Sequence, residues 1–309
     1  MKDLHVLPKF SDRWSHLYLD HGRLDQDAAG LCFWDQEGKL AIPIDQLALV
    51  MLGPGTAVTH AAMKALAENN CLMCWVGEYG VRVYAHNTGG THSAARLLRQ
   101  IAMYCDQDQR LQVALRMYQK RFDNPIPEGT GLDQIRGMEG ARVRHTYARL
   151  AKEYGVAFTR RDYDQGNWGS ADPPNRALSA ANACLYGVCH AAILSAGYSP
   201  AVGFIHTGSM LSFVYDIADL YKTEITIPVA FRVVAENELD VERRTRRACR
   251  DMFYECKLLD RILPDIAEVL NARDDLAERP GELEGRALSL VGGAEEWDIP
   301  GEPQQACAG

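Results

Sequence analysis

Glu139 lies among arginines at a spacing that suits one face of a helix. Arg136, Glu139 and Arg142 recur every three residues, which places each within about 60° of its neighbour on a helix. A solvated face with an Arg-Glu-Arg pair is the commoner explanation. Gly137 and Gly140 favour the close approach of a ligand or backbone, because glycine costs about 1 kcal/mol relative to alanine within a helix. Glu139 is therefore a candidate catalytic acid.

A second set of polar side chains follows in a segment that otherwise predicts a buried helix. Residues 212–222 are mainly apolar, yet Asp216, Asp219 and Lys222 recur there at intervals of three. Buried acids need a hydrogen-bonded partner or a cation. His206 precedes them between apolar residues, where a lone histidine is more often structural than a ligand. Because two acids follow His206, a role for it in a functional site is the better hypothesis.

Glutamate, histidine and aspartate without a nearby thiolate form a donor set for Mg²⁺ or Mn²⁺ rather than for structural zinc. Such an ion neutralises a scissile phosphate and orients an attacking hydroxyl in line with the leaving oxygen. The residue types therefore predict metal-assisted phosphodiester chemistry.

Arginines and aromatic residues surround these candidates along the chain. Guanidinium groups suit a phosphate backbone and rings suit unpaired bases, so the combination is typical of a DNA-binding surface. A solvated helix face paired with acids would by itself explain the arginines between 243 and 250. The residues are Arg136, Arg142, Arg144, Arg160, Arg161, Arg243, Arg244, Arg246, Arg247 and Arg250, with Tyr163, Trp168 and Tyr186.

Two further motifs are weaker. Cys71 and Cys74 have the spacing of half a zinc site, but no second pair follows at a fitting distance, and a buried strand explains them better. The loop from Gly53 to Thr56 lacks the lysine and the spacing of a P-loop. We interpret it as a strand-to-helix turn.

Two kinds of element must position these side chains, and together they predict an α+β fold. Short β-branched runs and turns, interrupted by one helix capped by Thr59, predict an N-terminal β-sandwich-like domain over 1–87. A 3.6-residue period then predicts a larger all-α catalytic domain over 88–279. Glycines, prolines and acids predict a flexible acidic tail over 280–309. The expected helical segments are 92–122, 132–154, 175–196, 210–222 and 240–271.

The net charge of -8 over 309 residues at first argues against a DNA-binding protein. Ten acids and three arginines in residues 268–309 account for -7 of that charge, whereas residues 96–161 carry +6. A nearly neutral body with a basic segment is able to hold an anionic partner. The acidity therefore does not exclude DNA.

The sequence also predicts a cytoplasmic protein. No uninterrupted apolar run approaches the ~18 residues of a membrane span, and the N-terminus lacks the hydrophobic segment of a signal peptide. The nine cysteines lie mainly in apolar stretches, which suits reduced thiols. We expect no membrane association.

Three separated motifs resemble a known family. The chain is similar to the CRISPR-associated DNA integrase, the catalytic subunit of the spacer-acquisition machinery. The motifs that carry the similarity are RGMEGARVRHTYARLAKEYGV, GFIHTGSMLSFVYDIADLYK and RRACRDMF, with GVRVYA upstream. The closest resemblance is to its subtype I-E branch. It covers residues 10–272 in one register.

The resemblance implies that Glu139, His206 and Asp219 bind Mg²⁺ or Mn²⁺ and catalyse the reaction, with Asp216 as a supporting acid. The 3′-hydroxyl of a captured DNA fragment would attack a phosphodiester at the edge of a CRISPR repeat. Without such an end, the site would act as a nuclease on branched DNA. The implied DNA contacts are Arg82, Arg136, Arg161, Tyr163, Trp168, Tyr186, Tyr215, Lys222, Arg243 and Arg246.

The resemblance also implies partners: double-stranded DNA with 3′ single-stranded ends, CRISPR repeat DNA, a second copy of the chain, and a small ferredoxin-like CRISPR-associated subunit. The chain departs from the best-known relative at three positions. His21 replaces an aromatic wedge, Ala57 an arginine and Ser209 a lysine. We expect these changes to affect fragment length, end bracing and the preferred protospacer-adjacent motif rather than the chemistry.

Two other functions are compatible with the residues. A stand-alone repair nuclease would cut branched DNA without joining a 3′-hydroxyl end to a repeat. A non-catalytic DNA-binding scaffold of the adaptation complex would keep the basic surface, but it would be expected to have lost at least one ligand type.

Overall fold

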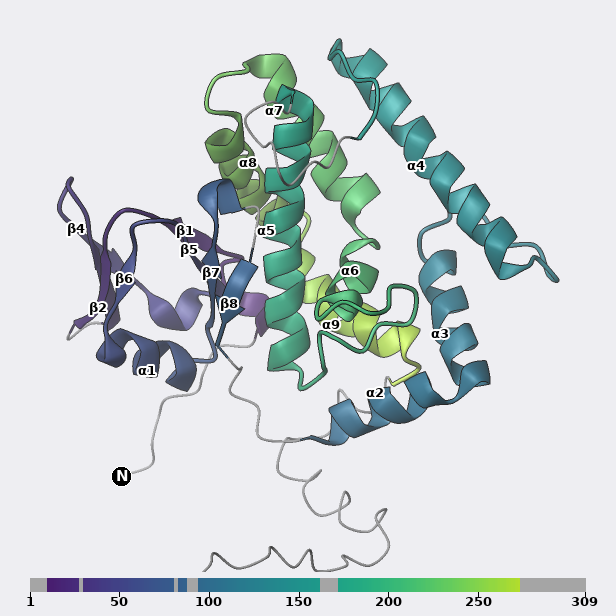
Figure 1. The fold of residues 1–309 in the computed structure, drawn as a ribbon, viewed down its shortest axis with the longest axis horizontal. Coiled ribbons are helices and arrows are strands. Elements are labelled where there is room, and N and C mark those ends of the chain that lie inside the picture. The colour runs from purple at the N-terminus through teal and green to yellow at the C-terminus, as the bar shows by residue number, and fades with distance from the viewer. Residues whose placement is uncertain (1–9, 28–29, 81–82, 88–93, 162–171, 273–309) are drawn as a thin grey trace, which may run out of the picture.

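The computed structural model describes residues 10–27, 30–80, 83–87, 94–161 and 172–272. The strands lie in the N-terminal part and most helices follow them, so the predicted α+β class is confirmed. Figure 1 shows the strands on one side of the molecule, α4 on the opposite side and α5 between them. The strands are β1 (Leu17–Leu19), β2 (Arg23–Asp27), β3 (Gly30–Trp34), β4 (Lys39–Ile42), β5 (Leu49–Leu52), β6 (Ala57–Val58), β7 (Leu72–Val76) and β8 (Val83–His86).

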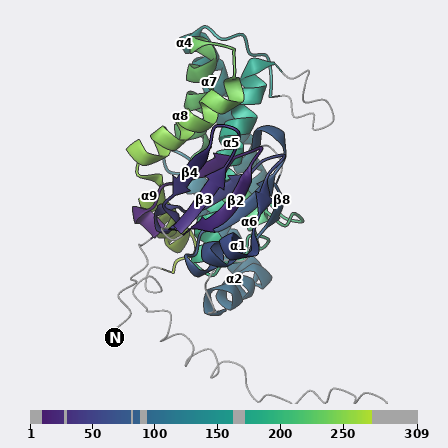
Figure 2. The ribbon, with the colours of Figure 1, turned by 90° about the vertical axis from the view of Figure 1, so that its left-hand side faces the viewer.

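Two four-stranded sheets form the N-terminal part. One sheet has the order β4-β3-β2-β6 and the other β1-β5-β7-β8, and Figure 2 shows the first sheet with α1 below it. Val50 and Leu52 of β5 belong to the core shared with the first sheet and with α1 (His60–Glu68). Leu49 and Met51 belong to the core shared with the helices. Because side chains alternate along a strand, the second sheet is buried on both faces.

Helices α6, α7, α8 and α9 pack around α5, which also contacts β5. By length and composition α5 could cross a membrane, although it contains no long uninterrupted apolar run. However, 83% of its most apolar window is buried inside the protein, as expected for a core helix. The helices are α2 (Ala95–Cys105), α3 (Gln107–Gln119), α4 (Leu132–Tyr154), α5 (Pro173–Ser195), α6 (Ser212–Ala218), α7 (Ile227–Glu236), α8 (Val241–Glu255) and α9 (Leu258–Val269).

Several helix boundaries differ from the sequence prediction. Segment 92–122 divides into α2 and α3 because Asp106 accepts a hydrogen bond from the Gln109 amide and so caps α3. Segment 240–271 divides at Lys257, whose φ of 50° breaks the helix. Helix α7 was not predicted, since its valines and isoleucine resemble a strand.

Of the three predictions for the N-terminal part, two agree with the structure and one does not. Thr59 caps α1 by accepting a hydrogen bond from the Ala62 amide, as expected. Cys71 and Cys74 are buried, which raises the pKa of each thiol to about 12 and supports a structural role. The loop from Gly53 leads into the short strand β6 before α1 begins, so the prediction of a direct strand-to-helix turn was wrong.

The domain boundary at residue 87 stays a prediction. Met51 and Leu72 of the second sheet share one hydrophobic core with Leu185 of α5, so the strands and helices pack as a continuous body. The predicted tail, 280–309, lies outside the described residues.

Candidate active site

The predicted catalytic side chains come from three elements. Glu139 lies in the middle of α4, His206 in the loop between α5 and α6, and Asp216 in α6. Asp219 follows directly at the C-terminal end of α6, and its amide still donates to the Tyr215 carbonyl.

Asp216 organises the loop that carries His206. Its carboxylate has no exposed surface and accepts hydrogen bonds from the backbone amides of Phe204, Ile205 and His206, at 2.6, 3.1 and 2.9 Å. A carboxylate that accepts several backbone N–H groups holds the donating segment in one conformation. Asp216 therefore supports the site from beneath the loop.

The imidazole of His206 is oriented by the same carboxylate. Its Nδ1 lies 2.8 Å from Oδ1 of Asp216, a contact in which the ring donates from Nδ1. The other nitrogen, Nε2, is then turned towards Asp219, whose Oδ2 lies 3.9 Å away. This carboxylate–histidine arrangement fixes the tautomer that leaves Nε2 as an electron-pair donor.

Glu139 is held by an arginine from its own helix. Nε and Nη2 of Arg142 donate to the two carboxylate oxygens at 2.8 and 2.9 Å, and Nη1 donates to the hydroxyl of Thr223 at 2.9 Å. Arg142 thus links α4 to the π-helical turn Lys222–Thr226. The expected carboxylate among guanidinium groups is present, although Arg136 pairs with Asp133 instead of Glu139.

Asp219 is held in its charged form by two cations. Its Oδ1 lies 2.6 Å from Nζ of Lys222. Burial alone would raise the pKa of Asp219, but Lys222 and Arg121 outweigh burial and place the pKa below the ordinary value of 3.8. Burial would likewise lower the pKa of Lys222, yet Asp219 and Tyr186 raise it. The carboxylate is therefore an anion at neutral pH.

Arg121 joins two of the candidate acids, Glu139 and Asp219, and no motif in the sequence indicates it. It follows the end of α3, and its side chain is 2% exposed. Its Nη1 lies 3.7 Å from Oε1 of Glu139 and 3.5 Å from Oδ2 of Asp219. Glu139 from α4 and Asp219 from the end of α6 therefore meet around one guanidinium group.

The donor chemistry fits a hard divalent cation, although the side chains do not form a ready-made cage. Among the described residues, no three carboxylate, imidazole or thiol groups lie close enough together to hold an ion. An ion would replace the positive charge that Arg142 and Lys222 now place on the acids. Two carboxylates and an imidazole with a fixed tautomer are suitable donors for Mg²⁺ or Mn²⁺.

Comparison with known proteins identifies the family. Residues 17–127 and 118–252 match the family described as CRISPR associated protein Cas1. The chain belongs to the Cas1 family. The protein called CRISPR-associated endonuclease Cas1 2 of Thermus thermophilus is 49% identical over 99% of this chain and 93% of its own length. The CRISPR-associated endonuclease Cas1 of Escherichia coli is 44% identical over 88% of this chain and 89% of its own length.

A solved structure supports the same fold for this Cas1 chain. The crystal structure described as a TtCas1-DNA complex has a TM-score of 0.77 and 45% sequence identity, and the match covers 95% of this chain and 100% of that one. The similarity therefore extends over both the strands and the helices.

Three of the predicted DNA contacts of this Cas1 chain lie beside the acids. The ring centroids of Tyr186 and Tyr215 are 5.0 Å apart, and Nζ of Lys222 lies 4.8 Å from the Tyr186 ring. The His206 ring lies 5.9 Å from that of Tyr215. These side chains form an aromatic and cationic wall next to His206 and Asp219.

The predicted arginines have varied surroundings. Arg136 and Arg144 on α4 and Arg243 on α8 are exposed. Arg161 instead donates to Asn175 and Ser179 of α5, and Arg246 stacks 4.1 Å from the ring of Tyr18. The contacts of Arg161 and Arg246 therefore connect elements of the fold. Arg82, Tyr163 and Trp168 lie outside the described residues.

Gly137 and Gly140 were expected to allow the close approach of either a ligand or another backbone segment. Among the described residues, no backbone segment approaches them. A Cβ at Gly137 would meet no atom within 4 Å, and one at Gly140 would meet only Nη1 of Arg144, at 3.3 Å. Because no backbone of the described residues lies against these two glycines, there is room beside them for a ligand.

The three positions at which the resemblance implies a departure from the best-known relative lie at two places in this chain. The His21 amide donates to the Pro54 carbonyl, and the Ala57 amide donates to the Gly22 carbonyl, so both positions lie at one turn of the N-terminal part. Ser209 lies three residues after His206, where its amide donates to the Ser212 hydroxyl. Residues 21 and 57 therefore lie close to each other, in a different part of the structure from the candidate acids.

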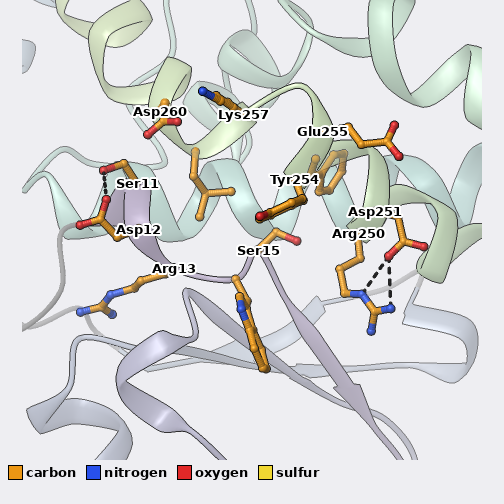
Figure 3. A pocket seen from close by; sticks show the side chains of 13 residues that line it. Ser11, Asp12, Arg13, Ser15, Arg250, Asp251, Tyr254, Glu255, Lys257 and Asp260 are labelled. Atoms are coloured by element: carbon orange, nitrogen blue, oxygen red, sulfur yellow. Dashed lines mark hydrogen bonds and ion pairs between the residues drawn. The ribbon is translucent and has the colours of Figure 1, made fainter.

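A cavity of about 840 Å³ lies apart from the acids (Figure 3). It is lined by residues 11–15 and by side chains of α8 and α9, including Arg250, Asp251 and Tyr254. Arg250 and Asp251 form an ion pair with each other there. None of the predicted catalytic residues lines this cavity.

Proposed function

We propose that this Cas1 chain is a metal-dependent DNA integrase of CRISPR adaptation. It joins the 3′-hydroxyl ends of captured DNA to a CRISPR repeat by transesterification and cuts branched DNA as a nuclease. The observation that carries the proposal is the arrangement of Glu139, Asp219 and His206, in which two carboxylates meet around a buried cation and an oriented imidazole faces one of them.

The roles of the side chains follow from their contacts. Glu139, His206 and Asp219 would hold a Mg²⁺ or Mn²⁺ ion, which supplies charge neutralisation at the scissile phosphate and orients the attacking hydroxyl. Asp216 keeps the imidazole in the tautomer that presents Nε2. Arg142 and Lys222, with side chains 24% exposed, can turn to phosphates once an ion neutralises the acids.

The DNA-binding surface would lie on the side of α4 and of the Tyr186–Tyr215 pair. The open space beside Gly137 and Gly140 leaves room for a phosphate backbone, and the exposed Arg136 and Arg144 lie on the same helix. Rings beside Lys222 suit unpaired bases at a 3′ single-stranded end. A relative 45% identical in sequence is described as a DNA complex, which supports DNA as the ligand.

The subtype and the partners are part of the proposal. The motif resemblance supports a subtype I-E system, a homodimer, and a small ferredoxin-like CRISPR-associated partner. Co-elution of the two subunits at a mass above that of the homodimer would support the assembly. Separate elution with and without DNA would contradict it.

The test of the chemistry is a half-site integration assay with Mn²⁺. We expect Glu139→Ala, His206→Ala and Asp219→Ala each to lose strand transfer by at least about 100-fold. Glu153→Ala is a matched control, because Glu153 lies on the same helix and pairs only with the exposed Arg149 among the described contacts. Wild-type strand transfer in the three site variants would overturn the proposal.

The same assay separates the alternative functions. A branched-DNA repair nuclease would cut junctions and yield no joined product from a 3′-hydroxyl fragment. A non-catalytic scaffold would bind the DNA and yield neither product, and its melting temperature would not respond to Mn²⁺.

A further inference from the structure

We infer that Arg121 is a positioning residue, a permanent internal counterion that holds Glu139 and Asp219 together and limits how tightly the site binds a divalent ion. The inference rests on the proposed function for its metal part only. The starting observation is that one guanidinium nitrogen, Nη1, lies at nearly equal distances from the two carboxylates, 3.7 and 3.5 Å.

The acids are held by two kinds of cation. Arg142 and Lys222 make short contacts of 2.6 to 2.9 Å with the carboxylates, and their side chains are 24% exposed. Arg121 makes longer contacts and is 2% exposed. Arg142 and Lys222 are only half-buried and can leave the acids for a phosphate, whereas Arg121 cannot leave while the fold is intact.

Arg121 is fixed by contacts on its other sides. Its Nη2 donates to the backbone carbonyl of Asp216 at 3.3 Å, and its guanidinium carbon lies 5.3 Å from the ring centroid of Tyr118. The residue therefore touches the side chains of two acids and the backbone of the third. It connects the end of α3 to α4 and α6.

The hydrogen bonding of Arg121 indicates an electrostatic role. Its Nε is buried and has no hydrogen-bond partner among the described residues, and an unsatisfied buried donor is destabilising. The contacts with Glu139 and Asp219 exceed hydrogen-bond length, so their carboxylate oxygens keep free lone pairs on that side. Arg121 reduces the repulsion between the acids without occupying the oxygens that an ion would use.

A fixed positive charge beside the acids has a consequence for ion binding. When Arg142 and Lys222 are turned away, Glu139 and Asp219 carry two negative charges and Arg121 contributes one positive charge. The ion then meets a site of net charge -1, and like charges a few ångströms apart repel strongly where water is excluded. Mn²⁺ should therefore bind weakly to the protein without DNA.

The test uses the full chain with Arg121→Met, which keeps the bulk and removes the charge. In EDTA we expect a lower melting temperature than that of the wild type, because the acids then repel each other. In a titration with MnCl₂ without DNA we expect half-saturation of the melting-temperature rise at an at least about tenfold lower Mn²⁺ concentration. Strand transfer should fall even though Mn²⁺ binds more tightly, because Arg121 no longer positions the two acids.

Arg116→Met is the matched control. Arg116 lies on α3, and its Nε donates to the Val269 carbonyl at 2.6 Å, away from the acids. Its loss should lower the melting temperature and leave the Mn²⁺ midpoint unchanged. Arg121→Lys, which keeps a positive charge, should stay close to the wild-type midpoint. Equal Mn²⁺ midpoints for Arg121→Met and the wild type would overturn the inference.

A metal-free arm keeps the inference separate from the proposed function. In EDTA, Arg121→Met should cost less stability in an Asp219→Asn background than in the wild type, because the charge that Arg121 neutralises is already gone. If Arg121→Met alone does not fold, Asp219→Asn should restore folding. An equal cost in both backgrounds, or no restoration, contradicts the counterion role. Failure of the proposed function would instead appear as normal integration by Glu139→Ala.

Discussion

Replacing Asp216 by asparagine should disable the site through the loop rather than through a lost ligand. Each carboxylate oxygen of Asp216 accepts two hydrogen bonds: Oδ2 from the amides of Phe204 and Ile205, and Oδ1 from the amide and Nδ1 of His206. An asparagine keeps one accepting oxygen and turns an NH₂ group towards the other two donors. Two N–H groups therefore lose their acceptor in either orientation.

The magnitude follows from those two donors. A buried donor left without an acceptor costs about 1 to 3 kcal/mol, so Asp216→Asn should lower the free energy of unfolding by about 2 to 6 kcal/mol. For a chain of 309 residues, an unfolding entropy of about 2.1 cal/mol/K per residue means that 1 kcal/mol corresponds to a shift of about 1.5 °C. The melting temperature should therefore fall by about 3 to 9 °C, even without any metal ion.

The assay needs both a stability and an activity readout. Circular dichroism in EDTA gives the melting temperature, and half-site integration is measured well below the lowest one. We expect Asp216→Asn to lose most strand transfer even when folded, because in either orientation two of the N–H groups that hold the His206 loop have lost their acceptor. Glu242→Gln is a matched control, since Glu242 is another buried acid, bonded to Arg176 instead of the site.

The control separates a weakened fold from a disordered loop. Glu242→Gln should also melt earlier but retain strand transfer at the assay temperature. A wild-type melting temperature for Asp216→Asn would refute the role of Asp216 in the loop. Equal activity of the two variants when folded would refute its role in orienting His206.

Three further predictions concern other charges. Burial opposes the lowered pKa of Asp219, but Lys222 dominates, so the carboxylate stabilises the fold above its unfolded pKa of 3.8. In urea unfolding, the wild type's advantage over Asp219→Asn should hold at neutral pH and shrink below about pH 4; an advantage growing there would contradict this. Deleting 280–309, with six acids and one arginine, should raise non-specific DNA affinity in a salt titration, and no rise would refute it. Arg161→Met should lower the melting temperature more than Arg136→Met, because Arg161 is bonded to α5; equal shifts would argue against this.

The sequence predicted those parts of the site that lie in motifs. Glu139 was a candidate because it lies among arginines, and His206 and Asp219 because acids and a histidine in apolar surroundings need partners. The structure brings Glu139 and Asp219 around Arg121 with His206 facing Asp219. The spacing of Asp216 and Asp219 suggested two equivalent acids on one face. Only the structure shows that the carboxylate of Asp216 accepts hydrogen bonds from the backbone amides of the loop, which Asp219 does not do among the described residues.

Arg121 could not be predicted in the same way. It lies in a run of ordinary helix-ending residues, MYQKRF, and its partners are distant in the chain. Its importance depends on the packing of α3 against the acids, which a single sequence does not display. Helix α7 was missed for a related reason, because β-branched residues favour strands locally, and burial against α5 and α8 overrides that preference.

The most direct test of the central claim changes only the donor DNA. Wild-type protein with Mn²⁺ is given a repeat-containing target and a fragment that ends in a 3′-hydroxyl or in a 3′-deoxy sugar. The proposed transesterification predicts a joined product of fragment and repeat with the 3′-hydroxyl end, none with the 3′-deoxy end, and none in EDTA. Repeat cutting at the same rate with both fragments, and no joined product, would contradict it.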